Sequence, residues 1–333
     1  MTRQDLAPLL VMGAGAWGTA MAIAIARTGR RVLLWGRDSS AVSRMADSRE
    51  NTRYLAGVRL PEALEPLAHL ELLPRGTDTA VLATPLQTTR EMLALAHAHG
   101  LTRFVCTAKG IETGSGRLVH EIVADAVGDF TEVAIVSGPS FAREVAEGRP
   151  TALAVAGANG VFAREIATSL HSPSLRPYLT DDVVGVAVGG AVKNVLAIAA
   201  GIGDGLALGA NSRAALITRG LAEMARLGEA LGGRRETFMG LAGLGDLVLT
   251  CTDDQSRNRR FGLALGQGRS LAGARSAVGL VEGLPTAEAV TARAMRCEVD
   301  MPICAQVART LRGECTPAEA VQALMTRDLK LAD

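Results

Sequence analysis

A lone lysine in an apolar, helix-forming run is the first feature of this sequence that could do chemistry. Residues 189–197 read Gly-Gly-Ala-Val-Lys-Asn-Val-Leu-Ala, so Lys193 and Asn194 stand among small and apolar side chains. A buried lysine loses its proton more easily than a solvated one and can act as a general acid or base. In a helix, Lys193 leans back over Gly189 and Gly190, which leave room for a ligand. The alternative is a close helix crossing from which the lysine reaches solvent.

Lysine is scarce in this chain, which favours a special task for the few that remain. Of the 35 Lys and Arg residues, only Lys109, Lys193 and Lys330 are lysines. Arginine keeps its proton in proteins, whereas lysine is a compact cation that can lose its proton. The few lysines in this chain therefore favour a role that arginine cannot fill. Lys109 follows an expected strand and precedes Gly110, which makes it the second candidate.

Two further groups of polar residues complete a candidate site. Asp246 is the carboxylate of the apolar, glycine-rich stretch 240–250, and a buried carboxylate needs a cation or hydrogen-bond donors. Residues 256–258, Ser-Arg-Asn, offer the donors that suit a phosphate dianion. A solvated charged loop or a nucleic-acid patch is the alternative, but the interleaved aromatic side chains of the latter are missing. Lys193, Asp246 and Arg257 are therefore predicted to form one site for a small phosphorylated substrate.

A glycine-rich turn near the N-terminus indicates a dinucleotide. Residues 9–12 form an apolar run, Gly13, Gly15 and Gly18 follow with the spacing G-x-G-x-x-G, and a helix-forming segment comes next. In this strand-turn-helix context the first glycine permits the turn, the second admits a pyrophosphate, and the third lets helix and strand pack closely. The helix N-terminus adds partial positive charge.

The end of the second expected strand bears on the choice of dinucleotide. An acidic residue here favours NAD by binding the ribose 2′-hydroxyl, whereas a cation favours the 2′-phosphate of NADP. The sequence has both, Arg37 and Asp38, so NADP(H) is predicted with NAD(H) also accepted.

The elements that must position these residues fall into two groups. Up to about residue 180 strand and helix signals alternate, which predicts an α/β, Rossmann-type doubly wound sheet in a domain of residues 1–180. Residues 181–333 are predicted to form an all-α domain that carries the substrate site. Beyond the first two, the expected strands are 70–73, 79–83, 103–107, 133–137, 152–155 and 175–179. The expected helices of the second domain are 183–200, 212–231, 257–266, 286–296, 303–312 and 317–326.

Residues that follow strands are expected to line the cofactor cleft, because ligands of such sheets lie beyond the carboxyl ends of the strands. Pro85 follows one strand, and residues 137–142, Ser-Gly-Pro-Ser-Phe-Ala, follow another. Pro85 is equally compatible with an ordinary turn. Gly138 and Ser140 also have a structural interpretation, as a turn residue and a helix cap.

Composition narrows the class of protein. The net charge of +1 does not favour nucleic acid or an anionic membrane surface as a partner. Five cysteines without a Cys-x-x-Cys pair indicate a reducing compartment, and the absence of a signal segment or an uninterrupted membrane span favours the cytoplasm. The five histidines lack metal-ligand spacing, so no metal site is expected, and no Gly-x-Ser-x-Gly indicates a hydrolase.

Together these motifs resemble the bacterial NAD(P)-dependent glycerol-3-phosphate dehydrogenase family. The resemblance extends over essentially the whole chain, and its longest motifs lie in the second half. The matching segments are 13–19, 109–110, 138–142, 189–194, 211–220, 240–251 and 256–262.

The resemblance implies reversible reduction of dihydroxyacetone phosphate by NAD(P)H to sn-glycerol 3-phosphate, for glycerophospholipid synthesis. It implies Lys193 as the proton donor and acceptor, with Asp246 also catalytic. The substrate residues implied are Lys109, Gly138, Ser140, Lys193, Asp246, Ser256, Arg257 and Asn258. The cofactor residues, with those of the glycine turn, are Gly13, Gly15, Ala16, Trp17, Gly18, Arg37, Lys109, Ala142, Arg257, Leu280 and Glu282.

Two positions depart from the commonest family pattern. Ala16 stands where serine is frequent and Leu280 where valine is common, but backbone contacts at both would leave activity intact. A homodimer is expected. The alternatives are a dehydrogenase of the same plan acting on a 3-hydroxy acid or sugar acid, and a non-catalytic NADP-binding sensor.

Overall fold

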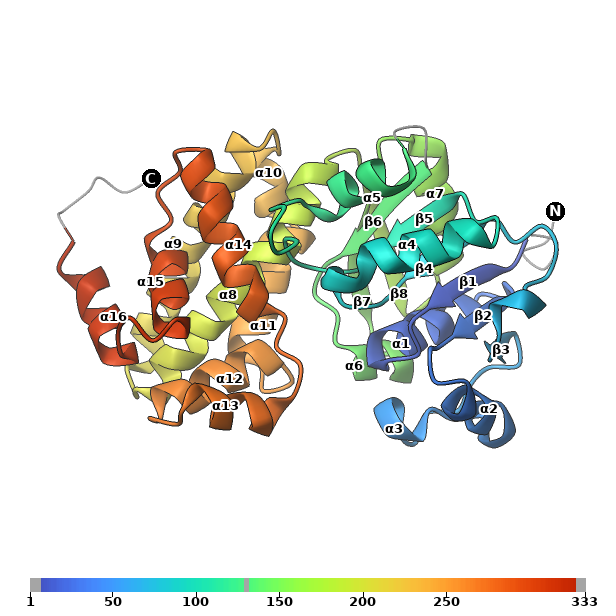
Figure 1. The fold of residues 1–333 in the computed structure, drawn as a ribbon, viewed down its shortest axis with the longest axis horizontal. Coiled ribbons are helices and arrows are strands. Elements are labelled where there is room, and N and C mark those ends of the chain that lie inside the picture. Colours follow the sequence, from blue (N-terminus) through green and yellow to red (C-terminus); the bar gives the residue numbers. More distant parts are fainter. Residues whose placement is uncertain (1–6, 129–131, 328–333) are drawn as a thin grey trace. The chain divides into compact units, whose positions relative to one another are not determined.

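The computed structural model describes residues 7–128 and 132–327, in two compact units (Figure 1). Unit 1 runs to Ala108 and resumes over Val119–Val183, and unit 2 contains Lys109–Leu118 and the chain from Val184. The sequence-based limits, 1–180 and 181–333, place 109–118 in the first domain. The segment instead clusters with the helices of unit 2, so Lys109 belongs to the helical unit.

Unit 1 is built on one eight-stranded sheet with the order β3-β2-β1-β4-β5-β6-β7-β8 (Figure 1). All neighbouring strands are parallel except β6 and β7, which are antiparallel. The central strands are continuous apolar runs because both of their faces are buried. The strands are β1 (Leu9–Met12), β2 (Val32–Trp35), β3 (Leu64–Leu67), β4 (Thr79–Leu82), β5 (Arg103–Cys106), β6 (Glu132–Ser137), β7 (Thr151–Ala156) and β8 (Leu175–Thr180).

Helices pack on this sheet as the alternating pattern predicted. Helices α1, α6 and α7 share a hydrophobic core with alternate strand residues such as Val11 and Val155. Helices α4 and α5 pack against each other and contact β4 and β6, in front of the sheet in Figure 1. The α-helices of this unit are α1 (Ala16–Ala26), α2 (Ser39–Ser48), α3 (Thr52–Leu55), α4 (Thr89–Ala98), α5 (Val119–Val127), α6 (Ala142–Glu147) and α7 (Gly160–Leu170).

One expected strand is wrong. Residues 70–73 were expected in the sheet, but Leu70–Leu72 form a 3₁₀ turn and Leu72 is 67% exposed. The third strand is Leu64–Leu67, whose Pro66 weakened the strand signal. Proline is tolerated there because β3 is an edge strand.

Unit 2 is helical and is centred on α8 (Val183–Gly205), in which every residue from Gly185 to Ile202 is buried. By length and composition α8 could cross a membrane, but 89% of its most apolar stretch is buried inside the protein, as in a core helix. The other helices are α9 (Gly209–Ala230), α10 (Arg235–Phe238), α11 (Asp246–Thr252), α12 (Arg257–Gly266), α13 (Leu271–Val278), α14 (Gly283–Arg296), α15 (Pro302–Leu311) and α16 (Pro317–Met325), with a π-helical turn at Leu241–Gly245. Helices α10, α11 and α13 were not expected, since they are short or follow glycine-rich sequence.

The backbones of α8 and α12 touch at glycines spaced four residues apart on each helix. A Cβ at Gly201 would lie 2.0 Å from the carbonyl oxygen of Arg259, and one at Gly262 would lie 2.1 Å from that of Ile198. Gly205 and Gly266 repeat the contact one turn further on. Larger side chains would separate the helices, so this crossing fixes the position of α12 against the helix that carries Lys193.

A buried carboxylate joins α9 to α15. Glu223 is 1% exposed, and its carboxylate accepts hydrogen bonds from the backbone N–H groups of Ile303 (2.7 Å) and Cys304 (3.2 Å). These are orphan donors of the first turn of α15, so Glu223 caps that helix from a distance. Burial raises the pKa of Glu223 to about 7, although the two hydrogen bonds oppose the rise.

We expect this carboxylate to make unit 2 less stable as the pH rises from about 4.5 to 7. In that range the folded protein holds a proton on Glu223 that the unfolded chain has released, so raising the pH removes stability. The stability of Glu223→Gln minus that of wild type should therefore grow by about 1.4 kcal/mol per pH unit in this window and level off above it. Denaturant unfolding of both proteins at several pH values measures this slope, and parallel curves would contradict the prediction.

Candidate active site

The glycine turn of unit 1 is tightly packed at Gly13 and Gly18 and open at Gly15. Gly13 has φ of 119°, and a Cβ there would lie 2.7 Å from the carbonyl oxygen of Ala83. A Cβ at Gly18 would lie 1.9 Å from the carbonyl oxygen of Gly13. By contrast, a Cβ at Gly15, which caps α1, would have no atom within 4 Å. The N-terminus of α1 is therefore open, as anion binding by backbone N–H groups requires.

The other residues expected near the cofactor leave the sheet at the same edge. Strands β1, β4, β5 and β6 are parallel neighbours, so Gly13, Pro85 and Gly138 follow carboxyl ends at one edge of the sheet. Gly138 has φ of 138°, and the Ser140 hydroxyl donates to its carbonyl oxygen (3.0 Å). Ser140 is not the cap of α6, whose N-cap is Phe141. The helix-cap interpretation of Ser140 is thus wrong.

The two charged residues after β2 have different environments. The Asp38 carboxylate accepts a hydrogen bond from the backbone N–H of Ala41 (2.9 Å) and so caps α2. Arg37 is exposed. The acidic group that would favour NAD is thus engaged in capping a helix.

In unit 2 two lysines converge on one carboxylate. Lys193 Nζ lies 2.5 Å from Asp246 Oδ1, and Lys109 Nζ lies 2.6 Å from Asp246 Oδ2. Lys193 also donates to the Thr250 hydroxyl (2.9 Å). The side chains of Asp246, Lys193 and Lys109 are 1%, 9% and 15% exposed. Asp246 begins α11, where the helix dipole favours an anion, and Thr250 follows one turn later.

This arrangement shifts the proton affinities of the site. Burial and, to a lesser extent, the neighbouring Lys109 ammonium lower the pKa of Lys193 to about 8, although Asp246 opposes the fall. Burial alone would raise the pKa of Asp246, but the two ammonium groups outweigh it and hold that pKa below the ordinary value. The site thus keeps an anion between two cations, and one of the cations can exchange a proton near neutral pH.

The expected role of Gly189 as clearance for a ligand is wrong. A Cβ at Gly189 would lie 2.4 Å from the carbonyl oxygen of Ala242, in the π-helical turn before Asp246. Gly189 thus permits a close backbone crossing that carries Asp246 to Lys193. A close helix crossing was the alternative interpretation of this segment. That alternative required Lys193 to reach solvent, but Lys193 is buried.

The residues expected to bind the substrate phosphate, 256–258, lie at the start of α12. Ser256 caps this helix, with its hydroxyl accepting from the backbone N–H of Arg259 (3.2 Å). Asn258 donates to Asn194 Oδ1 (2.9 Å) and accepts from the backbone N–H of Gly283 (2.9 Å), so it links α12 to α8 and α14. Arg257 is the first residue of the helix and is exposed.

The last two expected cofactor residues precede α14. Leu280 is 49% exposed, and Glu282 is the N-cap residue of this helix. Glu282 also contributes to the electrostatics of Lys193, whose positive charge it favours. Both residues therefore belong to the lysine-bearing unit.

Sequence reasoning missed Thr250 and the Asn194–Asn258 contact. Thr250 stands four residues after Asp246, the spacing of neighbours on one helix face, but no helix was expected there. Asn194 Nδ2 is buried with no hydrogen-bond partner among the described residues. The sequence signal for the Asn194–Asn258 contact was the polar amide of Asn194 in the otherwise apolar run of α8.

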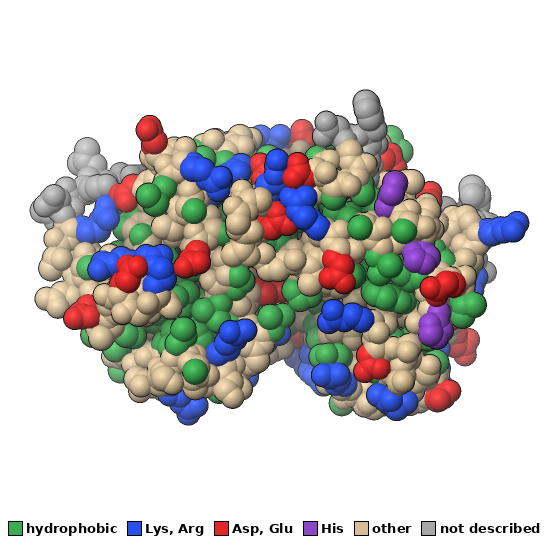
Figure 2. Space-filling model, in the orientation of Figure 1, with side chains coloured by type: hydrophobic (Ala, Val, Ile, Leu, Met, Phe, Trp, Pro, Cys, Tyr) green, Lys and Arg blue, Asp and Glu red, His purple; other side chains and the backbone are tan. Residues whose placement is uncertain are grey.

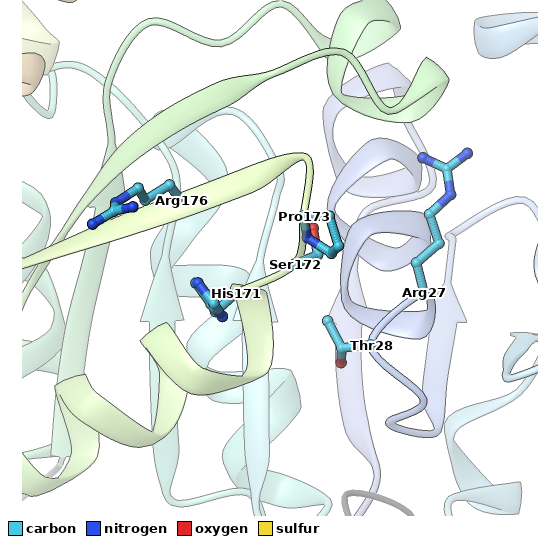
Figure 3. A pocket seen from close by; sticks show the side chains of 6 residues that line it. All are labelled: Arg27, Thr28, His171, Ser172, Pro173 and Arg176. Carbon is cyan, nitrogen blue, oxygen red and sulfur yellow. The ribbon is translucent and has the colours of Figure 1, made fainter.

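Other surfaces of the described residues offer less chemistry. No group of three or more His, Cys, Asp or Glu side chains there could hold a metal ion. Basic and acidic side chains are interspersed on the face shown in Figure 2. A pocket of about 470 Å³ in unit 1 has the lining residues Arg27, Thr28, His171, Ser172, Pro173 and Arg176, none of them an expected site residue. Arg27 points away from His171 and Arg176 (Figure 3) and donates to the Ala146 carbonyl oxygen.

A Rossmann-type sheet with an open glycine turn, together with a helical unit holding a lysine–carboxylate site, defines the class of dinucleotide-dependent dehydrogenases. Residues 8–163 match the N-terminal model, and residues 182–322 the C-terminal model, of NAD-dependent glycerol-3-phosphate dehydrogenase. The chain belongs to this family.

Relatives of this chain match it over nearly its full length. The chain is 54% identical over 326 residues to glycerol-3-phosphate dehydrogenase [NAD(P)+] of Thioalkalivibrio sulfidiphilus, with 97% of this chain and 98% of the relative covered. It is 50% identical to the protein of the same name from Nitrosococcus oceani, with 96% and 94% covered. The crystal structure of glycerol-3-phosphate dehydrogenase from Coxiella burnetii superposes with a TM-score of 0.91 at 44% identity, covering 96% of this chain and 99% of that one.

Proposed function

We propose that this protein catalyses the reversible NAD(P)H-dependent reduction of dihydroxyacetone phosphate to sn-glycerol 3-phosphate, with Lys193 as the general acid and base. The observation that carries the proposal is the buried Lys193–Asp246–Lys109 cluster in a chain of this family. A lysine with a pKa of about 8 serves both directions of such a reaction near neutral pH.

The chemistry follows from these side chains. A bound nicotinamide supplies the hydride that the substrate carbonyl carbon accepts. Protonated Lys193 hydrogen-bonds the carbonyl oxygen, stabilises the negative charge that develops on it and donates the proton. In the reverse direction neutral Lys193 removes the proton from the hydroxyl. Asp246 and Thr250 hold the Lys193 amine in place through hydrogen bonds of 2.5 and 2.9 Å.

The remaining substrate and cofactor contacts are part of the proposal. Lys109, Gly138, Ser140, Ser256, Arg257 and Asn258 would bind the substrate, Arg257 and Asn258 through its phosphate. The glycine turn would hold the pyrophosphate, and Ala16, Trp17, Arg37, Lys109, Ala142, Arg257, Leu280 and Glu282 would contact the rest of the cofactor. Exposed Arg37, beside a helix-capping Asp38, favours NADP(H) over NAD(H).

The setting of the enzyme is proposed as well. The reaction would provide sn-glycerol 3-phosphate for glycerophospholipid synthesis in the cytoplasm, by a homodimer. Residues 1–180, without the segment 109–118, would form the dinucleotide-binding domain, and residues 181–333 together with that segment would form the catalytic domain.

One assay tests the proposal against its alternatives. NADPH oxidation, followed by absorbance, should depend on dihydroxyacetone phosphate and should not occur with 3-oxo acids or with the oxo forms of sugar acids. Turnover with an oxo acid alone would identify another dehydrogenase of the same plan. Dinucleotide binding without turnover of either substrate would identify a sensor.

We expect Arg257→Ala to raise the KM for dihydroxyacetone phosphate about 10- to 100-fold. A hydrogen bond to a charged group contributes about 1.5–3 kcal/mol, and this guanidinium would donate to the phosphate. Steady-state kinetics at saturating NADPH measures the change. Arg260→Ala, another exposed arginine of α12, is the matched control and should leave the KM within about twofold. An equal KM in both variants would remove Arg257 from the phosphate site.

A further inference from the structure

We infer that Asn51 is a positioning residue for dinucleotide binding, and that it acts through the peptide between Ala14 and Gly15. Asn51 lies between α2 and α3 and is 4% exposed. Its amide Nδ2 donates to the carbonyl oxygen of Ala14 (3.0 Å) and to the hydroxyl of Thr19 (2.7 Å). The inference rests on the cofactor role of the glycine turn in the proposed function.

The contact with Ala14 orients the next backbone N–H. No described peptide bond is cis, and in a planar trans peptide the C=O and the following N–H point in opposite directions. Since the Ala14 carbonyl faces Asn51, the Gly15 N–H faces away from it. Gly15 caps α1, and the space about its Cα holds no other atom that a Cβ would meet. Asn51 thus orients the backbone N–H of Gly15 toward the open N-terminus of α1.

The contact with Thr19 ties the turn to the helix that follows. Thr19 is fully buried, and its backbone N–H donates to the carbonyl oxygen of Gly15 (3.0 Å). The amide of Asn51 therefore contacts both Ala14, which precedes Gly15, and Thr19, in the first turn of α1. On another side, a Cβ at Gly36 would lie 2.8 Å from Ala14 Cβ, so Ala14 is closely packed as well.

Asn51 is itself anchored. Its backbone carbonyl oxygen accepts from the backbone N–H of Leu55 (2.8 Å), the last residue of α3. Two N–H donors on a short side chain are needed to reach both partners, and neither aspartate nor leucine supplies them. Leucine has nearly the shape of asparagine, so Asn51→Leu removes the donors with little change in volume.

The test is binding of two ligands to the apoprotein by calorimetry. Asn51→Leu should weaken NADPH binding about tenfold or more, because the pyrophosphate loses an oriented donor. Binding of adenosine 2′-phosphate, which lacks the pyrophosphate, should change less than about twofold. At saturating NADPH, kcat and the KM for dihydroxyacetone phosphate should stay within about threefold of wild type.

Thr19→Val is the matched control, because it deletes the hydroxyl and leaves the Asn51–Ala14 hydrogen bond in place. It should change NADPH affinity less than about threefold. If Asn51→Leu fails to fold, Asn51→Ser takes its place, since a serine hydroxyl is too short to reach both partners.

Two results would overturn the inference. The first is wild-type NADPH affinity in a folded Asn51 variant, and the second is an equal loss of affinity for both ligands, which would indicate a general structural defect. If the wild-type protein itself binds no dinucleotide, the failure lies in the proposed function instead.

Discussion

Lys193→Met is expected to lower kcat for dihydroxyacetone phosphate reduction by about two orders of magnitude or more, the scale of general acid–base catalysis. Methionine fills similar space in the buried run of α8 but has no proton to donate, and it leaves Asp246 paired with Lys109 alone. NADPH affinity, measured by titration, should be largely kept. Steady-state kinetics at saturating substrate measures the loss, and turnover close to wild type would remove Lys193 from the mechanism.

The pH dependence of the wild-type enzyme belongs to the same prediction. Oxidation of glycerol 3-phosphate needs neutral Lys193, so kcat/KM should rise with pH and level off above an apparent pKa near 8. Reduction needs the protonated lysine and should fall over the same range. Lys193→Arg keeps a cation beside Asp246 but cannot release its proton, so it should abolish the oxidation direction most severely. A profile unchanged in this variant would contradict the assignment.

Gly201→Ala is expected to destabilise unit 2 by about 3 kcal/mol or more, the upper end of overpacking effects. The new Cβ would lie 2.0 Å from the Arg259 carbonyl oxygen and 2.7 Å from the Leu263 backbone nitrogen. Both are backbone atoms of α12 and cannot rotate away, so the two helices must separate. The melting temperature should fall by about 6 to 12 °C, as measured by circular dichroism.

Gly203→Ala is the matched control on the same helix. Its Cβ would meet only Leu208 Cδ1, at 3.8 Å, which is ordinary van der Waals contact. Because alanine favours a helix over glycine by about 1 kcal/mol, this variant should be as stable as wild type or slightly more stable. Equal melting temperatures for the Gly201 and Gly203 variants would show that the crossing of α8 and α12 is not tightly packed.

Local sequence patterns were enough to predict most elements. Helix α12 has the predicted bounds, 257–266, because a good N-cap residue, Ser256, precedes it and a helix-forming pattern marks it. Helix α11 was missed because glycines precede it and it has seven residues, too few for a periodic signal. The strand 70–73 was wrong because a short apolar run does not distinguish a strand from a buried turn.

The candidate site could also be predicted in part from local sequence. Scarce lysine, a carboxylate in an apolar stretch and the G-x-G-x-x-G turn are properties of residue type and spacing, and they predicted Lys193, Asp246 and Gly13 as site residues. The requirement that a buried carboxylate meets a cation or hydrogen-bond donors also predicted that Asp246 would have such partners. These statements need no knowledge of which helices cross.

The sequence by itself therefore determined the two kinds of unit and the residue types available for chemistry, since both follow from local pattern. Only the tertiary structure decided that Lys109 and Lys193 share Asp246, across 137 and 53 residues of chain. It also decided that Gly189 packs on Ala242, and that Asn51 holds Ala14. Such contacts depend on backbone crossings whose geometry results from the packing of the whole core, and no short stretch of sequence contains that information.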